Sequence, residues 1–247
     1  MTQVVLLTGA AGGIGTALTR ALLASGKTVL AVDMSPTALE RLAETAEAGA
    51  QALRLFPCDV TDPEAVTTLK HDLHRVGLSP SALINNAGIE RRAETGSPDF
   101  LQAWHQVMSV NLDAAANLSQ VFAPNLAEAR GCIVNVASIQ SFAVLHTANT
   151  AYAVSKAAIA QLTRAMAVEY APCGIRVNAV APGVVETPMI RQAGMDPARF
   201  SRFLDRIPMA RFAKPEEIAG PVEFLISPAA SYVTGAVLPV DGGFLAM

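Results

Sequence analysis

The most constraining feature of the chain is a glycine-rich stretch near its start, TGAAGGIG at residues 8–15. It follows the apolar run VVLL and precedes a pattern of apolar residues at helical spacing that ends at Gly26. Small residues at a strand-to-helix turn let the backbone approach a pyrophosphate, and the helix N-terminus offers free N–H groups and a positive dipole end. The spacing T-G-x-x-x-G-x-G differs from G-x-G-x-x-G, so a plain tight turn is the alternative interpretation.

The rest of the chain repeats this strand-and-helix order. Seven β-branched or aliphatic runs are predicted strands: 4–8, 28–33, 52–59, 82–88, 132–138, 176–182 and 236–241. Most of these runs are continuously apolar, as expected when helices cover both faces of a parallel sheet. The pattern predicts an α/β chain with a doubly wound parallel sheet of the Rossmann type, folded as one domain over residues 1–247. Residues 188–215 contain no clear strand, and we expect them to form an insertion of short helices over the substrate.

Composition excludes several classes of function. Hydrophobic residues make up 51% of the 247 residues and charged residues 16%, and the net charge of -3 gives no reason to expect nucleic acid. Cys58, Cys132 and Cys173 show no metal-binding spacing, which predicts reduced thiols and no metal site. The uncharged segment 131–155 is interrupted by polar residues, so it does not predict a membrane span. We therefore expect a soluble, cytoplasmic protein with neither nucleic acid nor membrane as a partner.

Asp33 ends the second predicted strand, roughly 20 residues beyond the glycine loop, where an acidic residue accepts the ribose hydroxyls of NAD. A 2′-phosphate there would meet a carboxylate, and no Arg or Lys stands in the loop or directly after Asp33. The position therefore favours NAD over NADP. The alternative is that Asp33 is only a turn residue at the end of a strand.

The sequence YAVSK at 152–156 carries a possible acid/base pair. Tyr152 and Lys156 are four residues apart and lie on the same face of a helix. An ammonium close to a phenol favours the phenolate and is expected to lower the tyrosine pKa, which suits a general acid/base. Ser138 ends a predicted strand with a hydroxyl that could bind a substrate oxygen, and Asn111 lies inside a helical pattern where its propensity gives no reason for it.

These motifs together resemble the short-chain dehydrogenase/reductase family over essentially the whole chain. The motifs, in chain order, are TGAAGGIG, Asp33, CDV at 58–60, NNAG at 85–88, Asn111, Ser138, the Tyr152/Lys156 pair, APGVVETPM at 181–189 and VDGG at 240–243. The resemblance implies a seven-stranded sheet with substrate and nicotinamide meeting at the carboxyl edge of the strands.

The resemblance also implies roles for individual residues. Tyr152 is the general acid/base, Ser138 holds the substrate oxygen, Lys156 binds the nicotinamide ribose and lowers the Tyr152 pKa, and Asn111 positions a water that relays protons from Lys156. A second set, together with Tyr152 and Lys156, would bind the cofactor: Gly9, Gly13, Ile14, Gly15, Asp33, Asp59, Val60, Asn86, Ala87, Gly88, Pro182, Gly183, Val185 and Thr187.

The expected substrate depends on the loop between Ser138 and Tyr152 and on the residues around it. The loop between Ser138 and Tyr152 is one residue longer than is common in the family, which weakens inference from close relatives. Besides Ser138 and Tyr152, the expected pocket residues are Gln140, His146, Glu90 and the segment 188–210, which suggest a small hydroxylated substrate such as a sugar acid or a polyol. Arg91 and Arg92 bind an anionic substrate group on one interpretation and form a solvated loop on the other.

Two other functions stay open at this level: a 3-oxoacyl-carrier-protein reductase, and a catalytically silent protein that senses dinucleotides. The resemblance further implies a homotetramer assembled through C-terminal tails and through pairs of long helices. The predicted interface helices run from Gln102 to Phe122 and onward from Tyr152, and the tail carries Phe244, Leu245 and Met247. The alternative for the tail is that it folds back on its own chain.

Overall fold

The computed structural model describes residues 2–46, 50–145, 147–187 and 204–247. The strands are β1 (Val4–Thr8), β2 (Thr28–Asp33), β3 (Leu53–Pro57), β4 (Ala82–Asn85), β5 (Cys132–Val136), β6 (Arg176–Pro182) and β7 (Val237–Val240). The helices are α1 (Gly13–Ala24), α2 (Pro36–Glu44), α3 (Pro63–Arg75), α4 (Phe100–Met108), α5 (Ala114–Glu128), α6 (Thr150–Tyr170) and α9 (Glu216–Ile226). Short 3₁₀ helices span Ala50–Ala52, Ile139–Ser141, Ala171–Cys173, Pro228–Ala230 and Phe244–Ala246, and a π-helix spans Ser109–Asp113.

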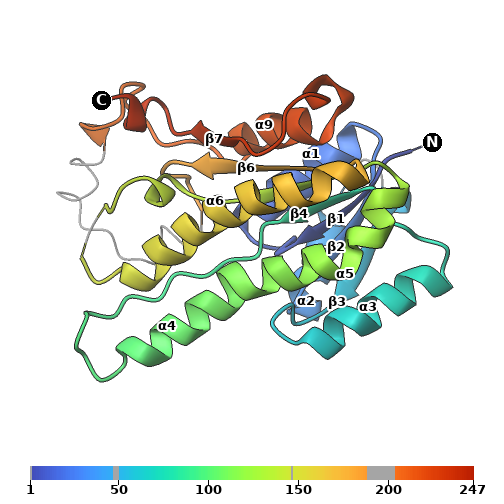
Figure 1. Ribbon diagram of the computed structural model, residues 1–247, viewed down its shortest axis with the longest axis horizontal. Helices are drawn as coiled ribbons and strands as arrows, with labels where there is room; N and C mark the ends of the chain where they lie inside the picture. Colours follow the sequence, from blue (N-terminus) through green and yellow to red (C-terminus); the bar gives the residue numbers. More distant parts are fainter. Residues whose placement is uncertain (1, 47–49, 146, 188–203) are drawn as a thin grey trace.

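The strands form one parallel sheet in the order β3-β2-β1-β4-β5-β6-β7 (Figure 1). The chain adds β2 and β3 on one side of β1 and then crosses back to place β4 on the other side. Beyond the carboxyl ends of β1 and β4 this reversal leaves a crevice, which is where open α/β sheets bind ligands. The predicted doubly wound, seven-stranded sheet is confirmed.

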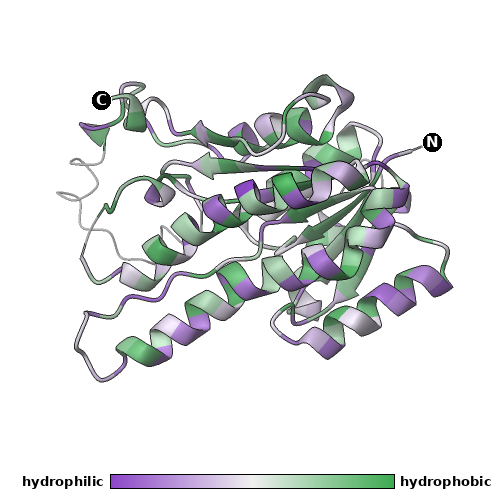
Figure 2. Cartoon of the chain, viewed as in Figure 1, coloured by the Kyte–Doolittle hydropathy of each residue, from purple (hydrophilic) through white to green (hydrophobic). Residues whose placement is uncertain are grey.

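Helices cover both faces of the sheet. In β1, Leu7 packs with α1, α2 and α9 on one face, and Leu6 packs with α3, α5 and α6 on the other. Figure 2 shows the strands as largely hydrophobic, with the polar residues gathered on the helices and loops. The uninterrupted apolar runs in the sequence therefore have a simple cause, because each strand is buried on both sides.

Four predicted strands run past the observed ends, because the chain leaves the sheet early at the carboxyl edge. The prediction 82–88 ends in the structure at Asn85, and the prediction 132–138 ends at Val136. The runs 52–59 and 236–241 shorten to Leu53–Pro57 and Val237–Val240. Most of the residues that were predicted as strand but lie beyond the observed strand ends turn toward the crevice and do not extend the hydrogen bonding of the sheet.

The long helix predicted from Gln102 to Phe122 is three segments: α4, the π-helix and α5. This helix was predicted to face a neighbouring subunit, but two of its residues, Ala115 and Leu118, are buried in this chain's own core. That part of the prediction is wrong. The π-helix fits one extra residue into its turn, which changes the face that α5 presents to the sheet.

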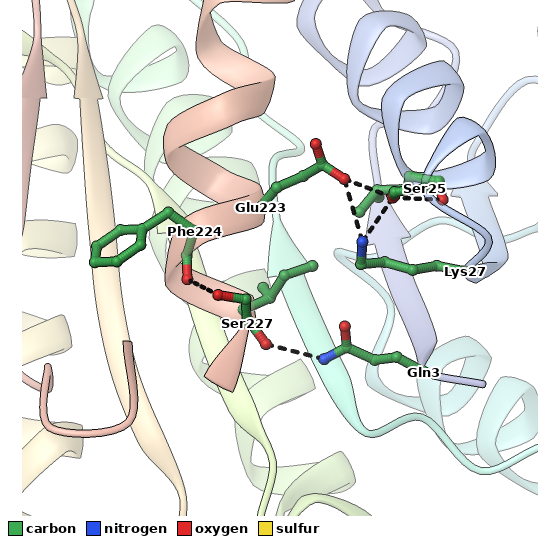
Figure 3. Close-up of polar contacts among 8 residues, drawn as sticks. Gln3, Ser25, Lys27, Glu223, Phe224 and Ser227 are labelled. Carbon is green, nitrogen blue, oxygen red and sulfur yellow. Dashed lines mark hydrogen bonds and ion pairs between the residues drawn. The ribbon is translucent and has the colours of Figure 1, made fainter. Parts of the chain in front are cut away.

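Polar contacts hold α9 beside α1 (Figure 3). Glu223 of α9 forms an ion pair with Lys27 at 3.2 Å and accepts a hydrogen bond from Ser25 at 2.6 Å. Gln3 donates a side-chain hydrogen bond to the Ile226 carbonyl at 3.0 Å. These contacts join the end of α9 to the start of β1 and the turn after α1.

The tail contains a buried aromatic residue. Phe244 is 3% exposed and packs with Ile139, Ile207 and Phe212, so this part of the tail folds back on its own chain. Residues 188–203 of the expected helical insertion lie outside the described residues. No helix in the described ranges is long and apolar enough to cross a membrane.

Candidate active site

The glycine loop has the conformation that its composition predicts. Gly9 adopts φ +60°, which favours glycine, and an added Cβ there would lie 2.9 Å from the Cα of Ala87. A Cβ on Gly15 would overlap the carbonyl oxygen of Gly9. The following helix α1 has no side-chain cap and no acidic residue in its first turn, so its N-terminal N–H groups suit an anion.

The NNAG turn locks this loop in place. The side chain of Asn86 donates hydrogen bonds of 3.0 Å to the carbonyls of Thr8 and Gly9. In return the Thr8 hydroxyl accepts hydrogen bonds of 3.1 Å from the backbone N–H groups of Asn86 and Ala87. Two turns that are far apart in the sequence therefore form one rigid floor at the carboxyl ends of β1 and β4.

Asp33 supports the same loop from β2. Its carboxylate accepts hydrogen bonds from the N–H of Ala11 at 3.2 Å and from the N–H of Ser35 at 3.1 Å. Asp33 also lines the crevice, as does the neighbouring Met34. The residue is thus a strand-end turn residue and an acceptor facing the crevice at the same time.

A cleft of about 790 Å³ runs along this edge of the sheet. Its wall contains every predicted cofactor residue: Gly9, Gly13, Ile14, Gly15, Asp33, Asp59, Val60, Asn86, Ala87, Gly88, Tyr152, Lys156, Pro182, Gly183, Val185 and Thr187. The glycine loop, the bare N-terminus of α1 and the acceptor at Asp33 match the pyrophosphate and ribose of a nicotinamide dinucleotide. The residues present therefore fit such a cofactor.

Tyr152 and Lys156 lie together in this wall. The Lys156 Nζ is 5.6 Å from the centre of the Tyr152 ring, and it donates a 2.7 Å hydrogen bond to the Val136 carbonyl. Burial lowers the pKa of Lys156 to about 8. Burial also raises the pKa of Tyr152 to about 12, against a lowering by the hydrogen bond with Ser138 and a further raising by the charge of Glu90.

The predicted lowering of the Tyr152 pKa by Lys156 is therefore wrong for the protein by itself. Desolvation disfavours the phenolate more strongly than neighbouring groups favour it. Four-residue spacing places the two side chains together, but burial, which the spacing does not reveal, sets the direction of the pKa shift.

Ser138 follows β5 and also lines the cleft. Its hydroxyl accepts a 3.1 Å hydrogen bond from the N–H of Gln140, and this contact caps the 3₁₀ helix Ile139–Ser141. The nearby Ser141 instead donates a 2.6 Å hydrogen bond to the Lys156 carbonyl. Of these two serines, Ser138 is the one beside Tyr152.

Asn111 is the one predicted catalytic residue that does not line the cleft. It lies in the π-helix, is 2% exposed, and donates 3.0 Å hydrogen bonds to the Ile89 carbonyl and the Ser155 hydroxyl. Its amide oxygen accepts a 2.8 Å hydrogen bond from the N–H of Ile89. The side chain therefore ties the turn after β4 to α6, next to Lys156. A cavity of about 10 Å³, close to the size of one water, lies beside Asn111.

The predicted substrate residues are partly visible. Gln140, Arg91 and Arg92 line the cleft together with Glu90, whereas His146 lies outside the described residues. Sequence reasoning missed further wall residues: Ala11, Gly12, Met34, Cys58, Thr61, Ile89, Val110, Val136, Ala137, Ile139, Leu145 and Val184. Most of them stand next to a predicted residue or at the end of a strand. The predicted strand ends could therefore have indicated these wall residues from the sequence.

Within the described ranges, no group of three or more His, Cys, Asp or Glu side chains could hold a metal ion. Cys58 and Cys132 are buried thiols and Cys173 is exposed. Burial raises the pKa of both Cys58 and Cys132 to about 11, so neither is poised as a thiolate at neutral pH.

A cleft lined by a glycine loop and a strand-end aspartate, together with a tyrosine, a serine and a lysine, defines a class of nicotinamide-dependent oxidoreductase. Residues 9–245 match the family model described as enoyl-(acyl carrier protein) reductase. The chain belongs to the short-chain dehydrogenase/reductase family. It is an oxidoreductase that acts on CH–OH donors.

The chain is similar to several characterised members of that family. It is 42% identical over 240 residues to galactitol 2-dehydrogenase (L-tagatose-forming) of Cereibacter sphaeroides, covering 96% of this chain and 93% of that protein. It is 39% identical over 244 residues to a 3-oxoacyl-[acyl-carrier-protein] reductase of Thermotoga maritima, covering 98% of each. A gluconate 5-dehydrogenase of Burkholderia cenocepacia, solved with NADP and tartrate, superposes with a TM-score of 0.89 at 31% identity, covering 99% of this chain and 96% of that one.

Proposed function

We propose that this chain is an NAD-dependent dehydrogenase that interconverts a secondary alcohol and a ketone on a polyol or a sugar acid. The observation that carries the proposal is the meeting of Tyr152, Ser138 and Lys156 in the wall of one cleft that fits a dinucleotide. The similarity to a galactitol dehydrogenase and a gluconate dehydrogenase supports the substrate class.

In this mechanism the cofactor supplies or accepts the hydride. The Ser138 hydroxyl binds the substrate oxygen, and the Tyr152 hydroxyl moves the proton to or from that same oxygen. Lys156 is held beside the tyrosine by its hydrogen bond to the Val136 carbonyl, and it would bind the ribose of a bound cofactor. Asn111 is a positioning residue, because it acts through the turn after β4 and through α6. Its role in a water relay stays a prediction.

A panel of polyols, sugar acids and a 3-oxoacyl thioester, each assayed with NAD(H) and NADP(H), tests the proposal. We expect turnover of at least one hydroxylated compound, followed by the absorbance of the reduced cofactor. The similarity to a 3-oxoacyl-[acyl-carrier-protein] reductase favours the thioester as the second candidate. Exclusive activity on the thioester would replace our proposal with that function. Cofactor binding without any turnover would leave a dinucleotide sensor.

The preference for NAD rests on Asp33. Its carboxylate faces the cleft, and the described basic residues of the cleft wall are Arg91, Arg92 and Lys156, which belong to the end near Tyr152. We expect kcat/KM to be about 10- to 100-fold higher with NAD than with NADP, since a 2′-phosphate would face an uncompensated carboxylate. Asp33→Ser should reduce that ratio to below about threefold. Equal activity of the unmodified protein with both cofactors would contradict the assignment.

We also propose that the chain forms a homotetramer in the cytoplasm. Support comes from exposed apolar side chains on the two candidate interface helices, Leu101 on α4 and Val154 and Val168 on α6. Light scattering at micromolar concentration should give the tetramer mass. A monomer mass for the intact chain would refute the assembly. The helical lid at 188–215 likewise stays a prediction.

A further inference from the structure

The segment GIERRAE, residues 88–94, is a charged loop that the structure fixes beside the catalytic residues. At its start, Ile89 is held by two hydrogen bonds with the side chain of Asn111, of 2.8 and 3.0 Å. At its far end, the N–H of Ala93 donates a 3.0 Å hydrogen bond to the carbonyl of Ala148, four residues before Tyr152. The loop is therefore anchored on both sides of Glu90, Arg91 and Arg92.

Three of the four charged side chains of this loop, those of Glu90, Arg91 and Arg92, line the cleft. Glu90 is 14% exposed at its side chain, and its carboxylate forms a 2.9 Å ion pair with the Nε of Arg92. Its charge reaches the phenol of Tyr152, so the loop lies at the substrate end of the cleft. Arg92 is 32% exposed at its side chain, and its ion pair leaves its two terminal nitrogens available.

Arg91, unlike Arg92, forms no ion pair within the described part of the chain. Its one hydrogen bond within the described part of the chain runs from Nη1 to the carbonyl of Glu90, at 3.1 Å. A guanidinium presents its donors along the edges of a planar fork. A contact at Nη1 therefore leaves the donors on Nη2 and Nε free for a ligand.

The charges at this end of the cleft do not cancel. Among the described wall residues near Tyr152, the carboxylate of Glu90 is balanced by Arg92, which leaves the charge of Arg91 in excess. Lys156 is 4% exposed and directed at the Val136 carbonyl. The other acidic wall residues are Asp33, the last residue of β2, and Asp59, which follows β3, at the opposite end. The substrate end therefore favours an anion.

We propose that the substrate is a hydroxylated carboxylate, a sugar acid and not a neutral polyol, and that Arg91, aided by Arg92, binds its carboxylate. This inference rests on the proposed function, of which it selects one substrate class. A carboxylate matches the fork of a guanidinium with two parallel charge-assisted hydrogen bonds. Glu90 has the part of a positioning residue, since its ion pair orients Arg92 toward the cleft.

The test compares D-gluconate with galactitol as matched probes of equal carbon number, one anionic and one neutral. Isothermal titration of each into protein saturated with the reduced form of its preferred cofactor measures binding without turnover. We expect gluconate to bind at least about tenfold more tightly than galactitol. Arg91→Gln should weaken gluconate binding about 10- to 100-fold, and Arg91→Lys, which keeps the charge but loses the fork, should lie between the two.

Arg75→Gln is the matched control, because Arg75 is an exposed arginine on α3 whose ion partner is Asp72. It makes the same change in net charge away from the cleft, and we expect gluconate to bind this variant as it binds the unmodified protein. The inference is overturned if gluconate binds no better than galactitol, or if Arg91→Gln and Arg92→Gln both bind it normally. Failure of the proposed function is a separate result, namely no turnover of any compound in the panel while cofactor binds.

Discussion

Replacing Tyr152 with Phe is expected to lower kcat by about 1,000-fold or more, while the dissociation constant for NADH changes less than about threefold. The ring, and with it the packing of the cleft wall, is retained, and the hydroxyl that exchanges the proton is lost. Stopped-flow absorbance measures turnover, and fluorescence titration measures NADH binding.

The pH dependence gives this variant a second readout. Because burial raises the pKa of Tyr152 to about 12, the tyrosine is a phenol at neutral pH and can donate a proton to a ketone. Oxidation of the alcohol needs the opposite, deprotonated form, so its rate should rise with pH. Lys156, with a pKa lowered to about 8, loses its positive charge above that pH, which is expected to limit the rise. In Tyr152→Phe the residual rate should lose this profile.

Tyr170→Phe is the matched control, since Tyr170 lies on the same helix, α6, and packs against the hydrophobic core away from the cleft. It should retain normal turnover. Near-normal activity of Tyr152→Phe would refute the assignment of the acid/base. Lys156→Ala is expected to reduce both turnover and NADH affinity, because Lys156 lies beside Tyr152 and is the residue proposed to bind the cofactor ribose.

The fold and the cofactor cleft could be predicted because their signals are local. A strand buried on both faces is a continuous apolar run, and a backbone turn that approaches a phosphate needs glycine. The hydrogen bonds between Thr8 and Asn86 could be expected for the same reason, because both residues stand at the ends of neighbouring parallel strands. Parallel strands bring such ends to one edge of the sheet whatever their separation in the chain.

The parts that could not be predicted depend on geometry with no sequence pattern of its own. The residues around Asn111 show no pattern that predicts a π-helix, yet Asn111 lies buried in one, and Leu118 of the helix that follows is buried as well. The pKa of Tyr152 depends on how deeply the phenol lies, which a spacing of four residues does not encode. Likewise, only the fixed path of the loop 88–94 shows that Glu90 and Arg92 pair inside the cleft.

A methyl group at Gly15 is expected to impair cofactor binding severely. In Gly15→Ala the new Cβ would overlap the carbonyl oxygen of Gly9 and lie 2.9 Å from backbone atoms of Ala10. That carbonyl cannot move freely, because it accepts hydrogen bonds from the N–H of Gly12 at 3.2 Å and from Asn86 at 3.0 Å. We expect the loop to shift as a unit and the affinity for NADH to fall about 100-fold.

Thermal unfolding with and without NADH distinguishes lost binding from lost folding, since a ligand raises the unfolding midpoint only of a protein that binds it. The unmodified chain should gain stability with NADH, and Gly15→Ala should unfold cooperatively at a lower temperature with no such gain. Gly220→Ala is the control: it lies within α9 with open space around the added Cβ, so it should stabilise the chain by about 0.5–1 kcal/mol and keep the full response to NADH. A normal response of Gly15→Ala to NADH would mean that the glycine loop is a tight turn and nothing more, because a loop displaced by that methyl group could no longer hold a pyrophosphate.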